Sequence, residues 1–157
     1  MDRRTYLRTL SPVIALAGGC ISLPTDDDEQ SPDGVSTEFS ILSQDPSGPM
    51  DHPPKITIAH EKQLVTVRGK LWRGNSCETV KPSVVEYDTG SRRFNLVIAA
   101  LEKETPLWVT SCQPALGAIE YELTARFQRT LPTVVTVTEQ PTDGYKQQRA
   151  AKTVQQR

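Results

Sequence analysis

The sequence predicts an all-β protein with one small antiparallel domain, either a β-sandwich or a barrel. Two observations support this prediction. Between residues 54 and 139, several segments alternate apolar and polar residues with a period of two, which is the period of a half-buried strand. Short sequences typical of turns separate most of these segments, and no segment is convincing as a helix.

The first two expected strands are residues 55–58 and 63–72. The former is rich in β-branched residues, which favour strands. The latter places its apolar and polar side chains on opposite faces, as a half-buried strand does. One face holds Val65, Val67 and Leu71, and the other holds Thr66, Arg68 and Lys70.

The remaining expected strands are residues 84–87, 94–98, 119–127 and 132–137. The first two are short runs rich in β-branched residues, and the turn-like sequence between them, residues 88–91, predicts a hairpin. The segment 119–127 shows the clearest alternation in the chain. The last segment opens with a proline, at a position where the missing N–H group does least harm.

Residues 54–139 are expected to form this domain, an immunoglobulin-like sandwich or a barrel, and a fold of that size buries only about 60–65% of its unfolded surface. In an exported chain we expect Cys77 and Cys112 to be paired. The bridge would close a loop of 36 residues, counting both ends, and contribute about 4 kcal/mol in the loop-entropy model. Both cysteines fall in expected loops, so the bridge would clamp loops, unlike the central bridge of an immunoglobulin-like sandwich. Trp72 and Trp108 are candidates to pack on it.

Two other roles for these cysteines find little support. A metal site would need further ligands, and the only histidines, His52 and His60, lack zinc-ligand spacing to a cysteine. A redox-active pair would favour the C-x-x-C motif, which is absent. The sequence therefore predicts no metal site and no cofactor.

The first twenty residues have the pattern of an export signal. Arg3 and Arg4 precede a mildly apolar stretch, residues 9–19, that is too short to span a bilayer. The arginine pair resembles a twin-arginine signal, and Leu-Ala-Gly-Gly-Cys at residues 16–20 resembles a lipobox. That resemblance implies a signal peptide of residues 1–19 and a lipid attached to Cys20. The alternative is an ordinary cleaved signal or a short buried segment, with Cys20 incidental.

This combination of signal and lipobox is similar to that of small secreted lipoproteins of halophilic archaea. The domain adds to the resemblance, with a cysteine after one strand, a hairpin at Val85-Glu86-Tyr87-Asp88, and a second cysteine leading into a long alternating strand. The resemblance implies a protein anchored by lipid on the extracytoplasmic face of the cell membrane. A bacterial lipoprotein is the alternative source.

Residues 20–53 are predicted to be a flexible acidic linker. They are rich in Pro, Ser, Asp and Gly, and from Ile21 to Pro53 there are eight acidic residues and no Lys or Arg. The acidic run at residues 26–29 lacks the alternating spacing of a calcium loop, so we expect it to be solvated. Within this linker only residues 37–42 have a composition that would add a short strand to the domain.

Residues 140–157 are predicted to be a disordered, basic polar tail, with a short helix as the alternative. The tail carries four basic residues against one acidic residue. Such scattered charges make a weak electrostatic footprint, so we expect no nucleic-acid partner.

The sequence does not favour an enzyme. The motifs G-x-S-x-G and H-E-x-x-H and a glycine-rich phosphate loop are absent. His52 and His60 are expected to be solvated, and Glu120 and Glu122 are expected on the wet face of a strand. We therefore expect no catalytic residues.

The leading hypothesis is a non-enzymatic, lipid-anchored surface module that binds another exported protein or a cell-envelope component. One alternative is a solute-binding or metal-binding envelope lipoprotein. Another is a structural component of the envelope with no discrete partner.

Overall fold

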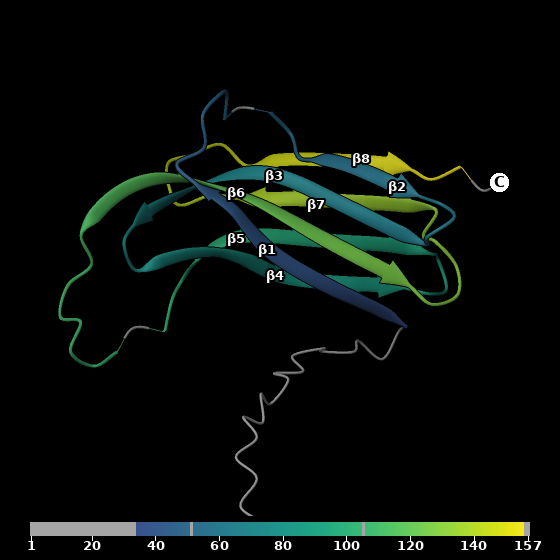
Figure 1. The fold of residues 1–157 in the computed structure, drawn as a ribbon, viewed down its shortest axis with the longest axis horizontal. Helices are drawn as coiled ribbons and strands as arrows, with labels where there is room; N and C mark the ends of the chain where they lie inside the picture. Colours follow the sequence, from purple (N-terminus) through teal and green to yellow (C-terminus); the bar gives the residue numbers. More distant parts are fainter. Residues whose placement is uncertain (1–33, 51, 105, 156–157) are drawn as a thin grey trace, which may run out of the picture.

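The chain folds as a β-sandwich in a computed structural model that describes residues 34–50, 52–104 and 106–155. Its eight strands are β1 (Val35–Gln44), β2 (Lys55–Ala59), β3 (Leu64–Asn75), β4 (Glu78–Asp88), β5 (Arg93–Glu102), β6 (Pro114–Phe127), β7 (Val134–Gln140) and β8 (Gln148–Thr153). They form two sheets of four strands (Figure 1). The described ranges contain no helix with the length and apolar character needed to cross a membrane. The predicted all-β fold class is confirmed.

The strand order is β1-β6-β3-β2 in sheet A and β4-β5-β7-β8 in sheet B. Every pair in sheet A is antiparallel, whereas β5 and β7 in sheet B run parallel. The reason is that β6 lies between them in the chain but belongs to sheet A, so β7 returns to sheet B in the direction of β5. The two-layer architecture is as expected, but the strand order differs from that of an immunoglobulin domain, and purely antiparallel pairing is wrong at this one pair.

Strand β1 lies inside the segment predicted to be a linker. The short strand considered at residues 37–42 is present and longer, because β1 pairs with β6 from Val35 opposite Phe127 to Gln44 opposite Ile119. Val35 is buried in the core, and the partly buried Phe39 packs against the core. The sandwich therefore begins at Val35, and the predicted domain boundary at residue 54 is too late.

Strand β8 corrects the prediction of a disordered tail. It pairs with β7 from Glu139 opposite Gln148 to Val134 opposite Thr153, and the next residue, Val154, is 4% exposed. The Lys152 ammonium also donates to the Ile56 carbonyl in sheet A at 3.0 Å. Pairing and burial of Val154 extend the domain beyond the predicted end at residue 139.

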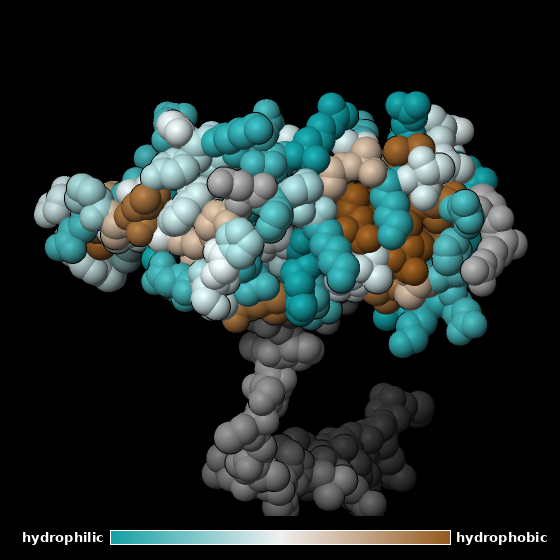
Figure 2. Space-filling model, turned by 90° about the horizontal axis from the view of Figure 1, so that it is seen from above, coloured by the Kyte–Doolittle hydropathy of each residue, from teal (hydrophilic) through white to brown (hydrophobic). Residues whose placement is uncertain are grey.

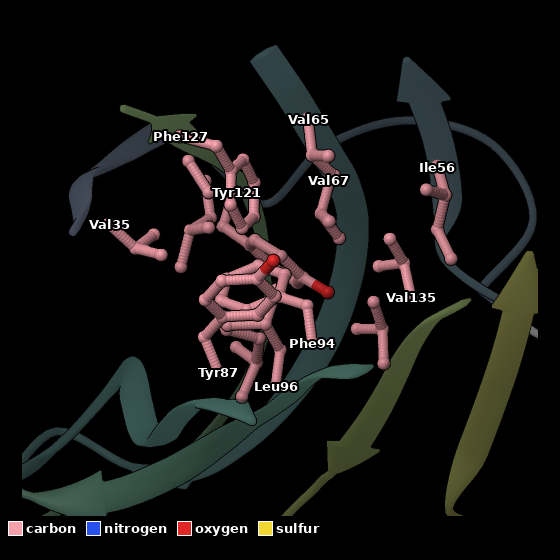
Figure 3. Close-up of a cluster of buried hydrophobic side chains, with 14 of the residues drawn as sticks. Val35, Ile56, Val65, Val67, Tyr87, Phe94, Leu96, Tyr121, Phe127 and Val135 are labelled. Carbon is pink, nitrogen blue, oxygen red and sulfur yellow. The ribbon is translucent and has the colours of Figure 1, made fainter. Parts of the chain in front are cut away.

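The core fills the space between the two sheets (Figure 3). Three aromatic rings meet edge to face at its centre, with ring centroids 5.1 Å apart for both Phe94–Phe127 and Tyr87–Phe127. Such pairs contribute about 0.5–1.5 kcal/mol beyond the burial of their area. The apolar faces predicted for residues 63–72 and 119–127 form the sheet A side of this core.

The connections gather at two opposite ends of the sandwich (Figure 1). The proximal end is where β1 begins, together with the turns at residues 60–63, 89–92 and 128–133. The distal end holds the β3–β4 turn, the β7–β8 loop and the connection from β5 to β6. A chain that arrives at β1 therefore meets the proximal end first, and the β5–β6 connection lies at the other end.

Candidate functional site

The connection from β5 to β6, here called the distal loop, comprises residues 103–104 and 106–113 in the described chain. The predicted Cys77–Cys112 disulfide is present, with an S–S distance of 1.97 Å and a Cα–Cα distance of 5.4 Å. It joins the distal loop to the β3–β4 turn. The expectation that the bridge clamps loops and does not link the sheet centres is confirmed.

Hydrogen bonds to the β3–β4 turn hold both legs of the distal loop. On the first leg, the Lys103 backbone N–H donates to the Cys77 carbonyl at 2.6 Å, and its ammonium donates to the Ser76 carbonyl at 3.0 Å. On the second leg, the Ser76 N–H donates to the Gln113 carbonyl, and the Gln113 N–H donates to the Ser76 hydroxyl, both at 3.0 Å. With the disulfide, these bonds make the base of the loop rigid.

The β3–β4 turn is itself held by polar contacts centred on Glu78. The Glu78 carboxylate accepts from the Gly74 N–H at 2.6 Å, the Asn75 side-chain amide at 3.2 Å and the Thr142 hydroxyl at 3.3 Å. Thr142 belongs to the β7–β8 loop, so three connections of the distal end support one another. The Trp72 ring packs against Tyr145 of the same loop, with centroids 5.4 Å apart.

The tip of the distal loop is apolar and exposed. Leu107 is 101% exposed and Trp108 is 82% exposed, and they occupy the corner of a turn closed by the Val109 N–H donating to the Pro106 carbonyl at 2.9 Å. Trp108 therefore does not pack on the disulfide, which corrects the prediction. Figure 2 shows hydrophobic atoms on this projecting end of the molecule, at the left.

Turn corners are normally occupied by Gly, Pro, Asn, Asp or Ser. A leucine at this position gives up the roughly 1.5–3 kcal/mol that burial of its side chain would contribute. The exposed tip therefore does not serve the stability of the described fold. A rigid base carrying exposed aromatic and aliphatic side chains is suited to insertion into a pocket of another molecule.

A second unusual feature is a carboxyl group inside the core. Glu139 on β7 is 0% exposed, and its Oε1 accepts a hydrogen bond from the Tyr121 hydroxyl at 2.7 Å. Its Oε2 has no hydrogen-bond partner in the described part of the chain. Gly69 on β3 makes room for this pair, because a Cβ there would collide with Glu139 Oε1 and lie 2.6 Å from the Tyr121 hydroxyl.

Burial raises the pKa of Glu139 to about 7, although the Tyr121 hydrogen bond and the Lys70 backbone amide oppose the change. Burial and the neighbouring Glu139 charge raise the pKa of Tyr121, which therefore remains protonated. Sequence analysis missed Glu139. Its signal was the odd-numbered alternation on β7, since Val135 and Val137 share its face.

Of the other sequence candidates, His52 and Glu120 both line one surface hollow, together with Lys55, Arg68 and Lys70. Among the described residues, His52 and His60 are exposed in different connections, and no group of three or more His, Cys, Asp or Glu residues is placed to hold a metal. Glu122 forms an ion pair with Arg68 at 3.0 Å. The pair is exposed to solvent and therefore contributes little to stability. Arg3, Arg4 and Cys20 lie outside the described residues.

Besides a hollow of about 300 Å³ lined by Ser36, Thr37, Glu38, Thr124 and Arg126, the surface of the described residues includes two others. One, of about 480 Å³, lies at the proximal end and is lined by Gly34, Tyr87, Thr89, Phe127, Gln128, Arg129 and Thr130. The other, of about 230 Å³, lies between the β1–β2 connection and the outer face of sheet A. The hollow at the proximal end has no carboxylate, imidazole or thiol in its lining, so it does not provide the acid and base groups of an active site.

Comparison of the chain with protein-family models, curated proteins and solved structures gave no match.

Proposed function

We propose that this protein is a non-enzymatic, lipid-anchored surface module that binds another exported protein or an envelope component through the tip of its distal loop. The observation that carries the proposal is the exposure of Leu107 and Trp108 on a base held by a disulfide and by hydrogen bonds to both legs. The anchor is the lipid expected on Cys20, and the binding surface is the tip.

The rigid base favours binding because it lowers the entropy lost on association. A loop free at its base would have to be ordered in the complex, whereas both legs of the distal loop are held at its base by the Cys77–Cys112 bridge and the Lys103 and Gln113 contacts. Tryptophan is also the side chain most enriched among residues that dominate binding energy at interfaces. The tip thus combines a suitable anchor residue with a suitable support.

The position of the tip agrees with display from a membrane. A lipid on Cys20 would lie before β1, and therefore on the proximal side of the sandwich. Strand β6 has 14 residues and runs between the two ends, a length of about 45 Å at the usual rise per residue. The tip would then be carried away from the anchoring membrane, toward molecules outside the cell.

The test is lysine-directed crosslinking on intact cells that express the full chain, followed by mass spectrometry. We compare the wild type with Leu107→Ser/Trp108→Ser. The matched control is Val84→Ser/Val85→Ser, which removes two exposed apolar side chains from strand β4 instead (42% and 37% exposed). Leu107 and Trp108 lie largely in solvent, whereas Val84 and Val85 are more than half covered. Thermal unfolding therefore first checks that both variants fold as the wild type does.

The proposal expects one dominant crosslinked partner that persists in the β4 variant and is lost in the loop variant. Crosslinks that only follow the abundance of neighbouring proteins would remove the binding-module proposal. A partner that survives the loop variant would leave a binding module but reject the distal loop as its surface.

A further inference from the structure

The sandwich has four edge strands in the described chain, β1 and β2 in sheet A and β4 and β8 in sheet B. The outer side of an edge strand carries backbone N–H and C=O groups that its own sheet does not pair. A strand from another molecule can pair with them and extend the sheet. Natural proteins therefore protect edges by shortness, charge, proline or bulges.

Three of the four edges show this protection. Strand β2 has only five residues, and β8 has six, including the cations Arg149 and Lys152. Strand β4 carries Pro82, where the register with β5 shifts between Pro82 and Val84. A proline removes a donor, and an irregular register bends the strand, so each of these edges resists addition of another strand.

Strand β1 is different. It has ten residues, contains no proline and has one charged side chain, Glu38. Seven consecutive residues, Val35–Ile41, pair with β6 in regular register before the shift that follows Ile41. At the end of this regular stretch, Ile41 and Leu42 are both 42% exposed. The edge of β1 is thus the longest regular edge of the sandwich, with one charged side chain in ten residues.

We propose that β1 is the site at which a second copy of this chain adds, through its own β1, in an antiparallel pair about a two-fold axis. Sheet A of one copy then continues into sheet A of the other as one sheet of eight strands. The proposal rests on β1 alone and does not depend on the distal loop or on the lipid anchor.

A second copy fits this edge because β1 can face itself without a conflict of charge. Residues that face each other in an antiparallel pair have the same hydrogen-bonding type, so odd positions face odd and even face even within the regular stretch. A two-fold axis at Glu38 would place two like charges opposite each other, which is destabilising.

A two-fold axis at Phe39 avoids this conflict and is the register that we assign. It places Phe39 opposite Phe39, Thr37 opposite Ile41, and Glu38 opposite Ser40. Aromatic pairs across strands are favourable, and Ile41 would lose part of its exposure. All of these residues lie within the regular stretch of β1.

The first experiment measures the molar mass of the full chain carrying Cys20→Ser, by light scattering after size-exclusion chromatography. Cys20→Ser prevents lipid attachment and removes a free thiol. We expect a dimer, which Ile41→Lys/Leu42→Lys converts to a monomer that still unfolds in one cooperative thermal transition, at a lower midpoint because association no longer stabilises the folded state. Leu107→Lys/Trp108→Lys in the distal loop, a control that also places two lysines at exposed apolar positions but away from β1, should remain a dimer. A monomeric parent, or equal effects of both variants, overturns the proposal.

The second experiment tests the register by disulfide formation under mild oxidation, again with Cys20→Ser. A mixture of Glu38→Cys and Ser40→Cys chains should form a covalent dimer, whereas neither chain alone should do so. In the control mixture, Ser36→Cys with Ser40→Cys, the two cysteines face each other only if the axis lies at Glu38. We therefore expect no crosslink in this mixture. A crosslink in the control mixture alone overturns the assigned register. No crosslink in either mixture also overturns the assigned register, and pairing through β1 is then judged by the first experiment.

Discussion

Replacement of Glu139 by glutamine should remove a pH dependence of stability that begins in the core. The Glu139 side chain is 0% exposed, and burial raises its pKa from 4.5 to about 7. The folded state therefore holds a proton that the unfolded state loses at lower pH. Stability from this group is fully present below about pH 4.5, decreases as the pH rises to about 7, and levels off above that value.

The expected loss follows from the size of this pKa difference. At 1.36 kcal/mol for each pKa unit, the change from 4.5 to about 7 corresponds to about 3 kcal/mol of unfolding free energy. Asp88 has the opposite sign, because its hydrogen bonds from Ser91 lower its pKa below 3.8. Its contribution is lost at pH values below this window, so it does not mask the effect of Glu139.

The assay is urea unfolding at pH 5 and at pH 8 for the wild type, Glu139→Gln and Glu120→Gln. Glutamine is neutral at both values, and at pH 5 part of the contribution of Glu139 is already lost, so the first variant should be less sensitive to pH than the wild type by about 2.5 kcal/mol. Any cost of burying the amide affects both pH values equally, and the difference between them remains informative. Glu120 lies on the outer face of sheet A and should behave as the wild type. Parallel behaviour of the wild type and Glu139→Gln between pH 5 and 8 would refute the reasoning.

Three further predictions concern the space beside Glu139, the disulfide and the anchor. Gly69→Ala should lower the unfolding free energy by about 1–3 kcal/mol, because the alanine Cβ would collide with Glu139 and Tyr121. Gly90→Ala, at an exposed turn, should not lower it, and urea unfolding compares the two variants. Cys77→Ala/Cys112→Ala should cost about 2–4 kcal/mol in the same assay, and equal stability with and without the bridge would contradict this. Cys20→Ser should move the protein from the membrane fraction to the soluble fraction of cells, and unchanged membrane association would reject the lipid anchor.

The predicted strands that were correct are those in which one face is buried and the other is wet. In β3 and β6 the apolar residues recur at every second position, and each strand lies in the middle of sheet A with only its inner face covered. Burial on one face makes the alternation visible in the sequence. The disulfide could also be predicted, since two cysteines remain once Cys20 is assigned to the lipid.

The edge strands β1 and β8 were harder to predict because edges expose more of their side chains. In β8 most residues are polar or small, and its place in the fold is decided by pairing with β7 and by the buried Val154 that follows it. In β1 the pairing with β6 decides the boundary of the domain. Neither contribution depends on a local pattern of hydrophobicity.

The sequence by itself determined the class of fold and the approximate positions of the central strands, because both follow from local alternation. It also led us to expect that the two domain cysteines pair, and the structure confirms this bridge. Only the tertiary structure decided that β5 and β7 run parallel, that Glu139 is buried beneath Gly69, and that Trp108 projects into solvent. These outcomes depend on which distant segments meet. The local sequence around a carboxylate or an indole is the same whether a partner strand covers that side chain or leaves it exposed.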